Sequence, residues 1–207
     1  MTCLRRPLLT MAKSSKLFRK AGVAGLVAAA LSLPVLGGAA GAAPSDPAAP
    51  AAAVQAPALS KAAKSQLARP RGAVCVNAHI QNIGWQGWRC SRGGRPVLAG
   101  TVGQSLRLEA LSISTSRTGG VCAQAHVQDL GWQRTRCGRD NEQITVGTVG
   151  RSLRLEALRL STRTGVCAQG HVQNIGWQPW QCVPRSATAT IGTVGQSLRL
   201  EALRVRV

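Results

Sequence analysis

The stretch HVQNIGWQPWQC, His171 to Cys182, is the third copy of a pattern that the chain has already used twice. The earlier copies are HIQNIGWQGWRC, His79 to Cys90, and HVQDLGWQRTRC, His126 to Cys137. Around them the chain aligns without gaps as three repeats with a period of about 45 residues: 74–115, 121–162 and 166–207. Such self-similarity is typical of repeat architectures. Three copies favour one closed, pseudo-threefold domain over an open solenoid.

Each repeat contains one pair of cysteines at the same spacing. The pairs are Cys75/Cys90, Cys122/Cys137 and Cys167/Cys182. An even number of equally spaced cysteines in an exported chain is typical of a disulfide framework, and the repeat symmetry favours pairing within each repeat. Closing a loop of this length should stabilise each repeat by about 3 kcal/mol. A zinc site is the weaker alternative, because no CxxC spacing occurs.

The N-terminal region has the composition of a secretory signal peptide. A basic stretch from Met11 is followed by an apolar stretch and then by small residues that end at Ala42. This order predicts a signal peptide over residues 1–42, with Met11 as an alternative start. A membrane anchor is disfavoured, because the apolar run is short and Pro34 interrupts it. Residues 43–72 are rich in Ala and Pro, so we expect a flexible linker, followed by a single domain at 73–207.

Alternating residues predict a β-hairpin in every repeat. In VCAQAHVQ, residues 121–128, the valines and alanines share one face, while Cys122 and His126 lie on the other. The following DLG or NIG suits a tight turn. Pairing across this turn places Cys122 opposite Cys137, as a disulfide requires, although a glycine bulge would shift the register by one residue. The same register puts one tryptophan per repeat in the apolar core: Trp85, Trp132 and Trp177.

Two further strands are predicted in each repeat. VLAGT, TVGT and TIGT indicate a third strand, and SLRLEAL with its continuation indicates a fourth. Leu, Glu, Ala and Arg also favour helix, but the β-branched endings favour strand. The alternation changes parity around Ala110, Ala157 and Ala202, which indicates a bulge. The fold class is therefore all-β, with one disulfide per repeat in a β-prism or β-trefoil-like arrangement.

A second tryptophan occurs in two of the three hairpins. Trp88 and Trp180 fall on the polar face, and the second repeat has Thr135 at this position. An exposed indole beside amide and imidazole groups suits stacking on a sugar ring. The alternative is that these tryptophans cover the disulfide or pack against the linker. The expected polar partners of a glycan are Asn77, Gln86, Gln169, Gln178, His79, His126 and His171.

The repeated charged residues fit structural roles. Arginine and glutamate lie two apart on one strand face and predict ion pairs: Arg107 with Glu109, Arg154 with Glu156, and Arg199 with Glu201. Each histidine is expected to bond within its own repeat, to a glutamine across the hairpin, although convergence of the three on a metal is an alternative. Cys3 lies in the predicted signal peptide, and the other six cysteines are expected to be paired, so none stays free as a nucleophile. We therefore assign no catalytic residue, metal or cofactor, and expect no enzyme activity.

The chain is strongly basic, with a formal net charge of +19; residues 1–42 contribute six of these charges, so the predicted mature chain is near +13. Such a charge favours anionic partners, namely wall polymers, acidic glycans, phospholipid surfaces or nucleic acid. The alternative is that the arginines form a solvated face that reflects composition alone.

The residues HVQ, GW, GTVG and LRLEAL, in this order in each repeat, resemble the ChW repeat, the clostridial hydrophobic repeat with conserved tryptophan. All three copies match, with HIQ in the first, and they cover nearly everything after residue 73. The resemblance implies secreted, surface-associated proteins of Gram-positive bacteria that serve adhesion or polymer binding, without catalytic residues. The paired cysteines depart from the family pattern.

We therefore expect a secreted, monomeric, non-catalytic module that binds cell-wall polysaccharide or another extracellular glycan, held at the bacterial surface without covalent attachment. The alternatives are an anionic polymer bound through the arginines, or another protein bound by an adhesin. Nucleic acid and stable membrane insertion are disfavoured.

Overall fold

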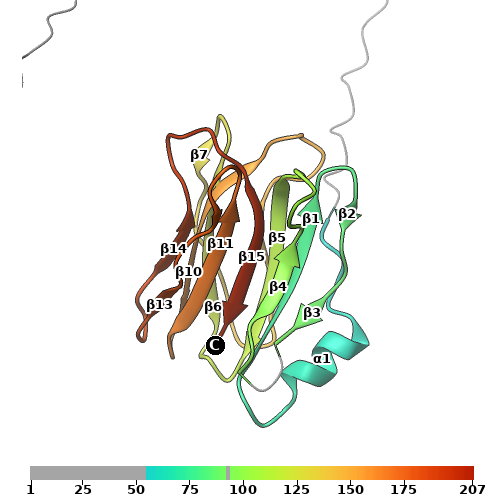
Figure 1. Ribbon diagram of the computed structural model, residues 1–207. Helices are drawn as coiled ribbons and strands as arrows, with labels where there is room; N and C mark the ends of the chain where they lie inside the picture. Colours follow the sequence, from blue (N-terminus) through green and yellow to red (C-terminus); the bar gives the residue numbers. More distant parts are fainter. Residues whose placement is uncertain (1–54, 92–93) are drawn as a thin grey trace, which may run out of the picture. The chain divides into compact units, whose positions relative to one another are not determined.

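The computed structural model describes residues 55–91 and 94–207. The predicted signal peptide and the first part of the predicted linker lie outside these residues. In the described part, three antiparallel five-stranded sheets and one short helix account for the regular structure (Figure 1). The domain is therefore nearly all-β, as the alternation predicts.

Each repeat contributes five strands in the same order. The first repeat contains β1 (Ala73–Ile80), β2 (Gly84–Trp85), β3 (Arg89–Cys90), β4 (Val97–Gly100) and β5 (Leu108–Ser116). The second contains β6 (Val121–Val127), β7 (Gly131–Trp132), β8 (Arg136–Gly138), β9 (Ile144–Gly147) and β10 (Leu155–Thr162). The third contains β11 (Val166–Val172), β12 (Gly176–Trp177), β13 (Gln181–Val183), β14 (Ala189–Gly192) and β15 (Leu200–Arg206).

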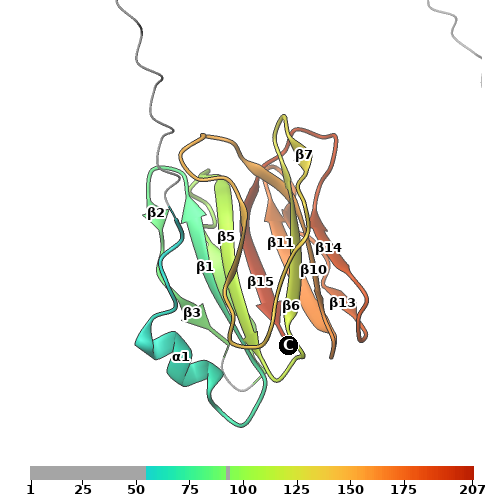
Figure 2. The same cartoon turned by 180° about the vertical axis from the view of Figure 1, so that it is seen from behind.

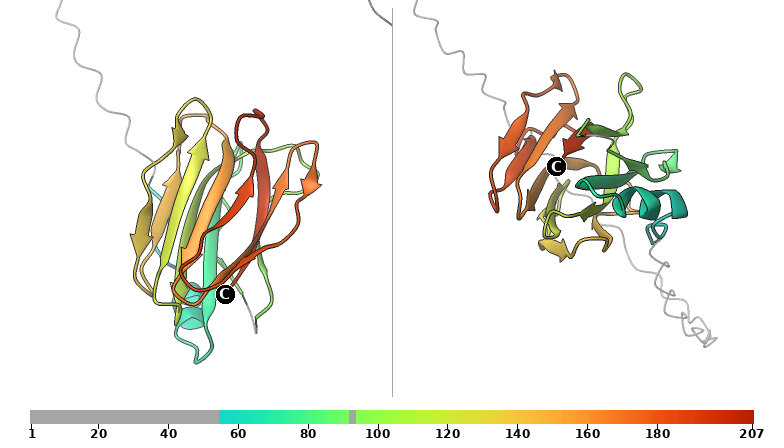
Figure 3. Two further views of the ribbon diagram at one scale, coloured as in Figure 1. Left: turned by 90° about the vertical axis from the view of Figure 1, so that its left-hand side faces the viewer. Right: turned by 90° about the horizontal axis from the view of Figure 1, so that it is seen from below.

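The repeats exchange strands, and this exchange closes the domain. The first sheet has the order β2-β1-β5-β9, the second β14-β10-β6-β7 and the third β12-β11-β15-β4, with β3, β8 and β13 also paired to β1, β6 and β11. Each sheet thus takes its fourth-position strand from the next repeat, and β4 of the first repeat completes the third sheet. Viewed along the strands, the sheets surround a common centre (Figure 3). This arrangement is a β-prism rather than a β-trefoil.

Aliphatic side chains from all three sheets fill the interior. Leu111, Leu158 and Leu203 occupy the same position in their repeats, are fully buried and belong to one core cluster. Burial alternates along β6 as predicted, with the valines and alanines inside. The core therefore forms from the inner faces of the sheets, without any tryptophan among its buried members.

The cysteine register is as predicted, and the tryptophan register is not. Cys122 pairs with Cys137 and forms a disulfide, as do the corresponding pairs of the other repeats. Near the turn, however, His126 pairs with Trp132 and Val127 with Gly131. Three residues therefore form the loop, with Asp129 at a φ of 60° and Gly131 at 69°.

This shift of one residue corrects the expected place of the hairpin tryptophans. Trp85, Trp132 and Trp177 are half-buried, and each contacts the histidine of its own repeat edge-to-face, with ring centroids 5.1 to 5.2 Å apart. They belong to the outer, polar side of the sheets. The structural reason is that a three-residue loop followed by a glycine bulge rotates the returning strand by one position.

Part of the segment expected as a flexible linker is ordered. Helix α1 (Lys61–Leu67) begins after Ser60, whose hydroxyl accepts a hydrogen bond from the backbone N–H of Ala63 at 3.2 Å. Ala63 and Leu67 are buried in a small cluster with Cys75 at the outer side of the first sheet. Figure 2 shows α1 beside β3. No helix in the described ranges is both long and apolar enough to span a bilayer.

Candidate functional site

Three equivalent clusters of histidine, glutamate and arginine lie where the repeats join. In the second repeat, Nδ1 of His126 is 3.1 Å from Oε2 of Glu156, and Nη2 of Arg154 is 2.8 Å from Oε1 of the same carboxylate. The other repeats give the same geometry to within 0.1 Å: His79 with Glu109 and Arg107, and His171 with Glu201 and Arg199. Each arginine lies one residue before the strand that carries its glutamate, and the pairing is the one expected from the sequence.

A β-bulge brings each glutamate to its histidine. Leu155 pairs with Val127 and Ala157 with His126, so Glu156 is the extra residue between them. Its carbonyl oxygen accepts a hydrogen bond from the backbone N–H of Thr193 in the next repeat, at 2.9 Å. The three clusters therefore help to hold the exchanged strands. In the described part of the chain, no group of three His, Cys, Asp or Glu side chains is arranged to bind a metal.

The predicted glutamine ligands are bonded to the backbone. Oε1 of Gln178 accepts from the N–H of Gly192 at 2.7 Å, and its Nε2 donates to the carbonyl of the same glycine at 3.0 Å. Gln86 makes the same two contacts with Gly100. The glutamines thus bridge the hairpin to the exchanged strand, and they do not bond to the histidines.

The other two predicted amide ligands also serve the hairpins. Asn77 is buried, and its Oδ1 accepts from the N–H of Gly87 at 2.9 Å. Gln169 is nearly buried and donates from Nε2 to the carbonyl of Gln178 at 2.8 Å. The structure therefore brings the predicted polar residues together as supports of the hairpin, away from an open surface.

The two polar-face tryptophans have different surroundings. Trp88 is partly buried in the cluster that contains Leu59 and Leu67, and its Nε1 donates to the carbonyl of Ala58 at 3.0 Å. It is therefore covered by the segment that precedes the first repeat. Trp180 is 37% exposed, with the Cζ of Arg206 5.6 Å from the ring centroid.

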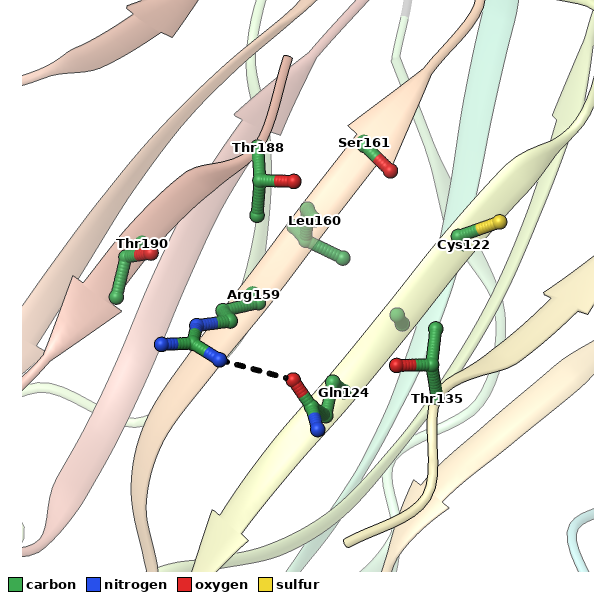
Figure 4. Close-up of a pocket in the computed structure, with 9 residues that line it drawn as sticks. Cys122, Gln124, Thr135, Arg159, Leu160, Ser161, Thr188 and Thr190 are labelled. Atoms are coloured by element: carbon green, nitrogen blue, oxygen red, sulfur yellow. Dashed lines mark hydrogen bonds between the residues drawn. The ribbon is translucent and has the colours of Figure 1, made fainter. Parts of the chain in front are cut away.

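A groove lies on the outer face of the second sheet, where Thr135 takes the place of the second tryptophan. Its volume is about 400 Å³, and hydroxyl groups line it on both sides. Figure 4 shows Thr188 and Thr190 on one side of Arg159, with Gln124 and Thr135 on the other. Nη1 of Arg159 donates to Oε1 of Gln124 at 3.2 Å.

The central arginine of this groove is held by an aromatic ring. The Cζ of Arg159 lies 4.0 Å from the centroid of Trp132. A guanidinium stacked on an indole keeps its edge free for hydrogen bonds. Gln124 is also fixed, because its Nε2 donates to the carbonyl of Gln133 at 2.8 Å. The two polar groups are therefore positioned before any ligand is present.

Two larger grooves adjoin the first. One, of about 960 Å³, shares Thr135 with it and also contains Arg134 and Arg136. The other, of about 580 Å³, shares Cys122 with the first and contains Arg139 and Arg163. Together the three grooves form a polar surface around the Cys122–Cys137 disulfide, which we call the second-repeat groove. Five arginines line this surface, together with a single acidic residue, Glu142.

The sequence contains one signal for this site. Arginine occurs at position 159 and at the equivalent Arg204, but the first repeat has Ser112 there. Only the second repeat has this arginine and lacks the second tryptophan. The surface of the second repeat is therefore expected to differ from the other two.

The sequence profile described as clostridial hydrophobic W, or ChW, matches residues 79–116, 126–162 and 171–207. These ranges cover more than half of the chain. The protein belongs to the ChW family. Each ChW match begins at the histidine of the cluster, so the first cysteine of every disulfide lies outside it. No curated protein and no solved structure gave a match to the chain.

The ChW motifs supply the residues at which the three repeats contact one another. HVQ supplies the histidine, GTVG begins at the glycine that the hairpin glutamine binds, and LRLEAL contains the bulged glutamate. The shared pattern of the ChW repeats thus encodes the scaffold. Arg159 and Thr135 lie within the second match but outside these motifs, as expected for residues that give one repeat its own surface.

Proposed function

We propose that this ChW protein is a non-catalytic extracellular module that binds an acidic glycan of a bacterial surface in the second-repeat groove. The observation that carries the proposal is the composition of this groove, which is lined by five arginines and several hydroxyl groups but by only one carboxylate. Arginine pairs with carboxylate and phosphate through two parallel hydrogen bonds. Hydroxyl and amide groups suit the hydroxyls of the sugar rings.

The dimensions favour a chain of sugars over a single one. A groove of about 400 Å³ is at the lower end of the size range of small-ligand sites, but it continues into two larger grooves on the same surface. The arginines are distributed along this surface. A polymer with repeated anionic groups would contact several of them at once, and weak contacts along one chain would add to a useful affinity.

The charge pairing within the domain favours an anionic over a neutral polymer. The three cluster glutamates are buried and already paired with Arg107, Arg154 and Arg199. Asp140 is bonded to the backbone of residues 118–120. In the described ranges these contacts engage most of the acidic residues, which leaves the groove arginines for an external partner.

An extracellular location is supported by the three disulfides, because such bonds persist in oxidising compartments. ChW family membership and the signal-peptide pattern of residues 1–42 agree with it. The absence of catalysis is proposed because the repeated acids and histidines serve the strand joints and each is present in triplicate.

The test compares two arginines that occupy the same position in two repeats. Arg136 lines the second-repeat groove, whereas Arg89 is its exposed counterpart in the first repeat. Binding of the secreted protein to immobilised polygalacturonate, teichoic acid and neutral dextran would be measured by biolayer interferometry. We expect Arg136→Ala to weaken binding to an acidic polymer about fivefold or more, Arg89→Ala by less than about twofold, and dextran not to bind.

Equal losses in the two variants would contradict the proposal, because they would indicate non-specific attraction between a basic protein and any polyanion. Binding to dextran that neither substitution affects would contradict the acidic specificity.

A further inference from the structure

The first sheet already binds an extended peptide, which is part of the same chain. Residues 55–60, Gln-Ala-Pro-Ala-Leu-Ser, cross its outer side before helix α1, and we call this segment the strap. Nε1 of Trp88 donates to the carbonyl oxygens of Pro57 and Ala58 at 3.3 and 3.0 Å. Nε2 of Gln143 donates to the carbonyl of Pro57 at 3.2 Å. The strap follows β2 and β3 toward α1 (Figure 2).

The recognition of the strap depends mainly on its backbone. Its contacts are hydrogen bonds to carbonyl oxygens, together with packing of Leu59 in the cluster that contains Trp88. Proline suits this mode of binding because it restricts the chain to an extended conformation and has no N–H group to leave unpaired. Aromatic grooves that bind extended proline-containing segments use the same chemistry.

The third sheet repeats the central element of this surface. Trp180 stands two residues before Cys182, as Trp88 stands two residues before Cys90. The two hairpins also have the same register, with Cys167 opposite Cys182 and Cys75 opposite Cys90. Trp180 nevertheless is 37% exposed, and its indole N–H makes no hydrogen bond within residues 55–91 and 94–207.

The surroundings of Trp180 supply the other features of a peptide surface. Pro96 and Leu98, on or beside the exchanged strand β4, take the positions of Gln143 and Thr145 and make this surface more apolar. Arg204 and Arg206 replace two serines of the first sheet, and the Cζ of Arg206 is 5.6 Å from the Trp180 ring. Donors for backbone carbonyls are therefore present, and they carry positive charge.

We propose that the outer face of the third sheet binds an extended, proline-containing acidic peptide of another protein, with the Trp180 indole donating to a carbonyl at the proline. The second sheet lacks this capacity, because Thr135 replaces the tryptophan. The site is independent of the second-repeat groove. A chain with one glycan surface and one peptide surface would connect a wall polymer to a surface protein.

The experiment uses the protein with uniform ¹⁵N labelling and two synthetic hexapeptides with blocked ends. One has the strap sequence Gln-Ala-Pro-Ala-Leu-Ser, and the other has aspartate in place of the glutamine. The indole N–H signal of Trp180 is assigned from its loss in Trp180→Phe, a variant that keeps an aromatic ring and removes the donor. We expect both peptides to shift this signal in a saturable way, and the acidic peptide to bind more tightly.

Further results separate the proposal from its alternatives. Trp180→Phe should weaken peptide binding about fivefold or more, measured from backbone amide shifts, whereas Arg151→Ala, at an exposed loop residue, should leave it unchanged. No shift of the Trp180 signal at millimolar peptide would overturn the proposal. A shift of the Trp88 signal alone would also overturn it, because the peptide would then only replace the strap. A shift of Trp180 with oligosaccharide fragments but not with peptide would make this residue a sugar platform instead.

Discussion

Gly147 of the second repeat lies directly against Glu109 of the first: a Cβ atom at position 147 would stand 2.4 Å from the Glu109 carbonyl oxygen. The same approach occurs between Gly100 and Glu201 and between Gly192 and Glu156, at 2.3 Å. At each place a strand of one repeat pairs with the sheet of another, next to the bulge that carries the glutamate. The first glycine of GTVG is therefore needed for closure of the prism.

Substitution of this glycine should unfold or severely destabilise the domain. Gly147→Ala combines a backbone φ of 98° with a clash against backbone atoms, so we expect a loss of at least about 3 kcal/mol in the free energy of unfolding. Gly150, the second glycine of the same motif, has a φ of 72° but open space around it. Gly150→Ala should cost only about 1 kcal/mol. Urea unfolding of both variants measures the difference in the free energy of unfolding. Similar losses in the two variants would contradict the role of Gly147 in closing the prism.

The buried glutamates should be more important for stability than for binding. Glu156→Gln removes the buried charge that pairs with Arg154 and faces His126, and it should cost about 2 kcal/mol because the partly buried Arg154 loses its ion-pair partner. Glu142→Gln makes the same charge change at an exposed residue and should cost less than about 0.5 kcal/mol. Thermal unfolding, monitored by circular dichroism, compares the two variants. An equal effect would show that the cluster does not stabilise the contact between repeats.

Asp140 should make the stability of the domain depend on acid pH. Burial alone would raise the pKa of this carboxyl, but hydrogen bonds from the backbone of Thr118, Gly120 and Gly119 and from the Thr118 hydroxyl outweigh it and hold the pKa below the ordinary value of 3.8. A lowered pKa in the folded state stabilises the fold above the ordinary value, and this contribution is lost as pH falls through the folded pKa.

The variant Asp140→Asn should therefore be less stable than wild type at neutral pH, and the difference should shrink at pH values below 3.8. Asp129→Asn is the matched control, because the other repeats have asparagine at this turn position. This control substitution should have little effect on the free energy of unfolding. Urea unfolding at several pH values measures both variants, and a pH-independent loss in Asp140→Asn would contradict the assignment.

Helix α1 should depend on its two buried residues. Leu67→Ala removes a side chain that is 3% exposed, and we expect a loss of about 2–3 kcal/mol in the local stability of the helix and the strap. Lys61→Ala, at an exposed position of the same helix, should have no comparable effect. Hydrogen exchange of the amides of residues 63–68 provides the measurement. Unchanged protection in Leu67→Ala would mean that the packing contributes little.

Much of the scaffold could be predicted because its signals are local. Alternation located β6, and equal cysteine spacing paired Cys122 with Cys137. The parity change in LRLEAL located the bulge beside Ala157. The register near the turn could not be predicted in the same way, because DLG fits a loop of two or of three residues. That single residue decides whether Trp132 faces the core or the polar side.

The binding surfaces depend on contacts between distant parts of the chain, and sequence patterns describe these poorly. The strap has no aromatic residue and no alternation, and its binding surface exists only once Trp88 and Gln143 are brought together by the first sheet. The sequence therefore leaves two roles open for Trp88, a sugar platform or packing against the preceding segment, and the folded chain shows the second. The second-repeat groove is likewise not evident from the sequence, because it depends on the small size of Thr135 beside strands from two repeats.

The central claim is that the second-repeat groove binds an acidic glycan, and Thr135→Trp tests it most directly. This variant places in the second repeat the residue that the first and third repeats already have, so the fold should tolerate it and the net charge is unchanged. The indole would occupy the space between Gln124 and the β8 side of the groove. We predict that binding to polygalacturonate or teichoic acid falls about tenfold, with the near-ultraviolet circular dichroism still that of a folded protein. Undiminished binding by the folded variant would contradict the account and move the site away from this groove.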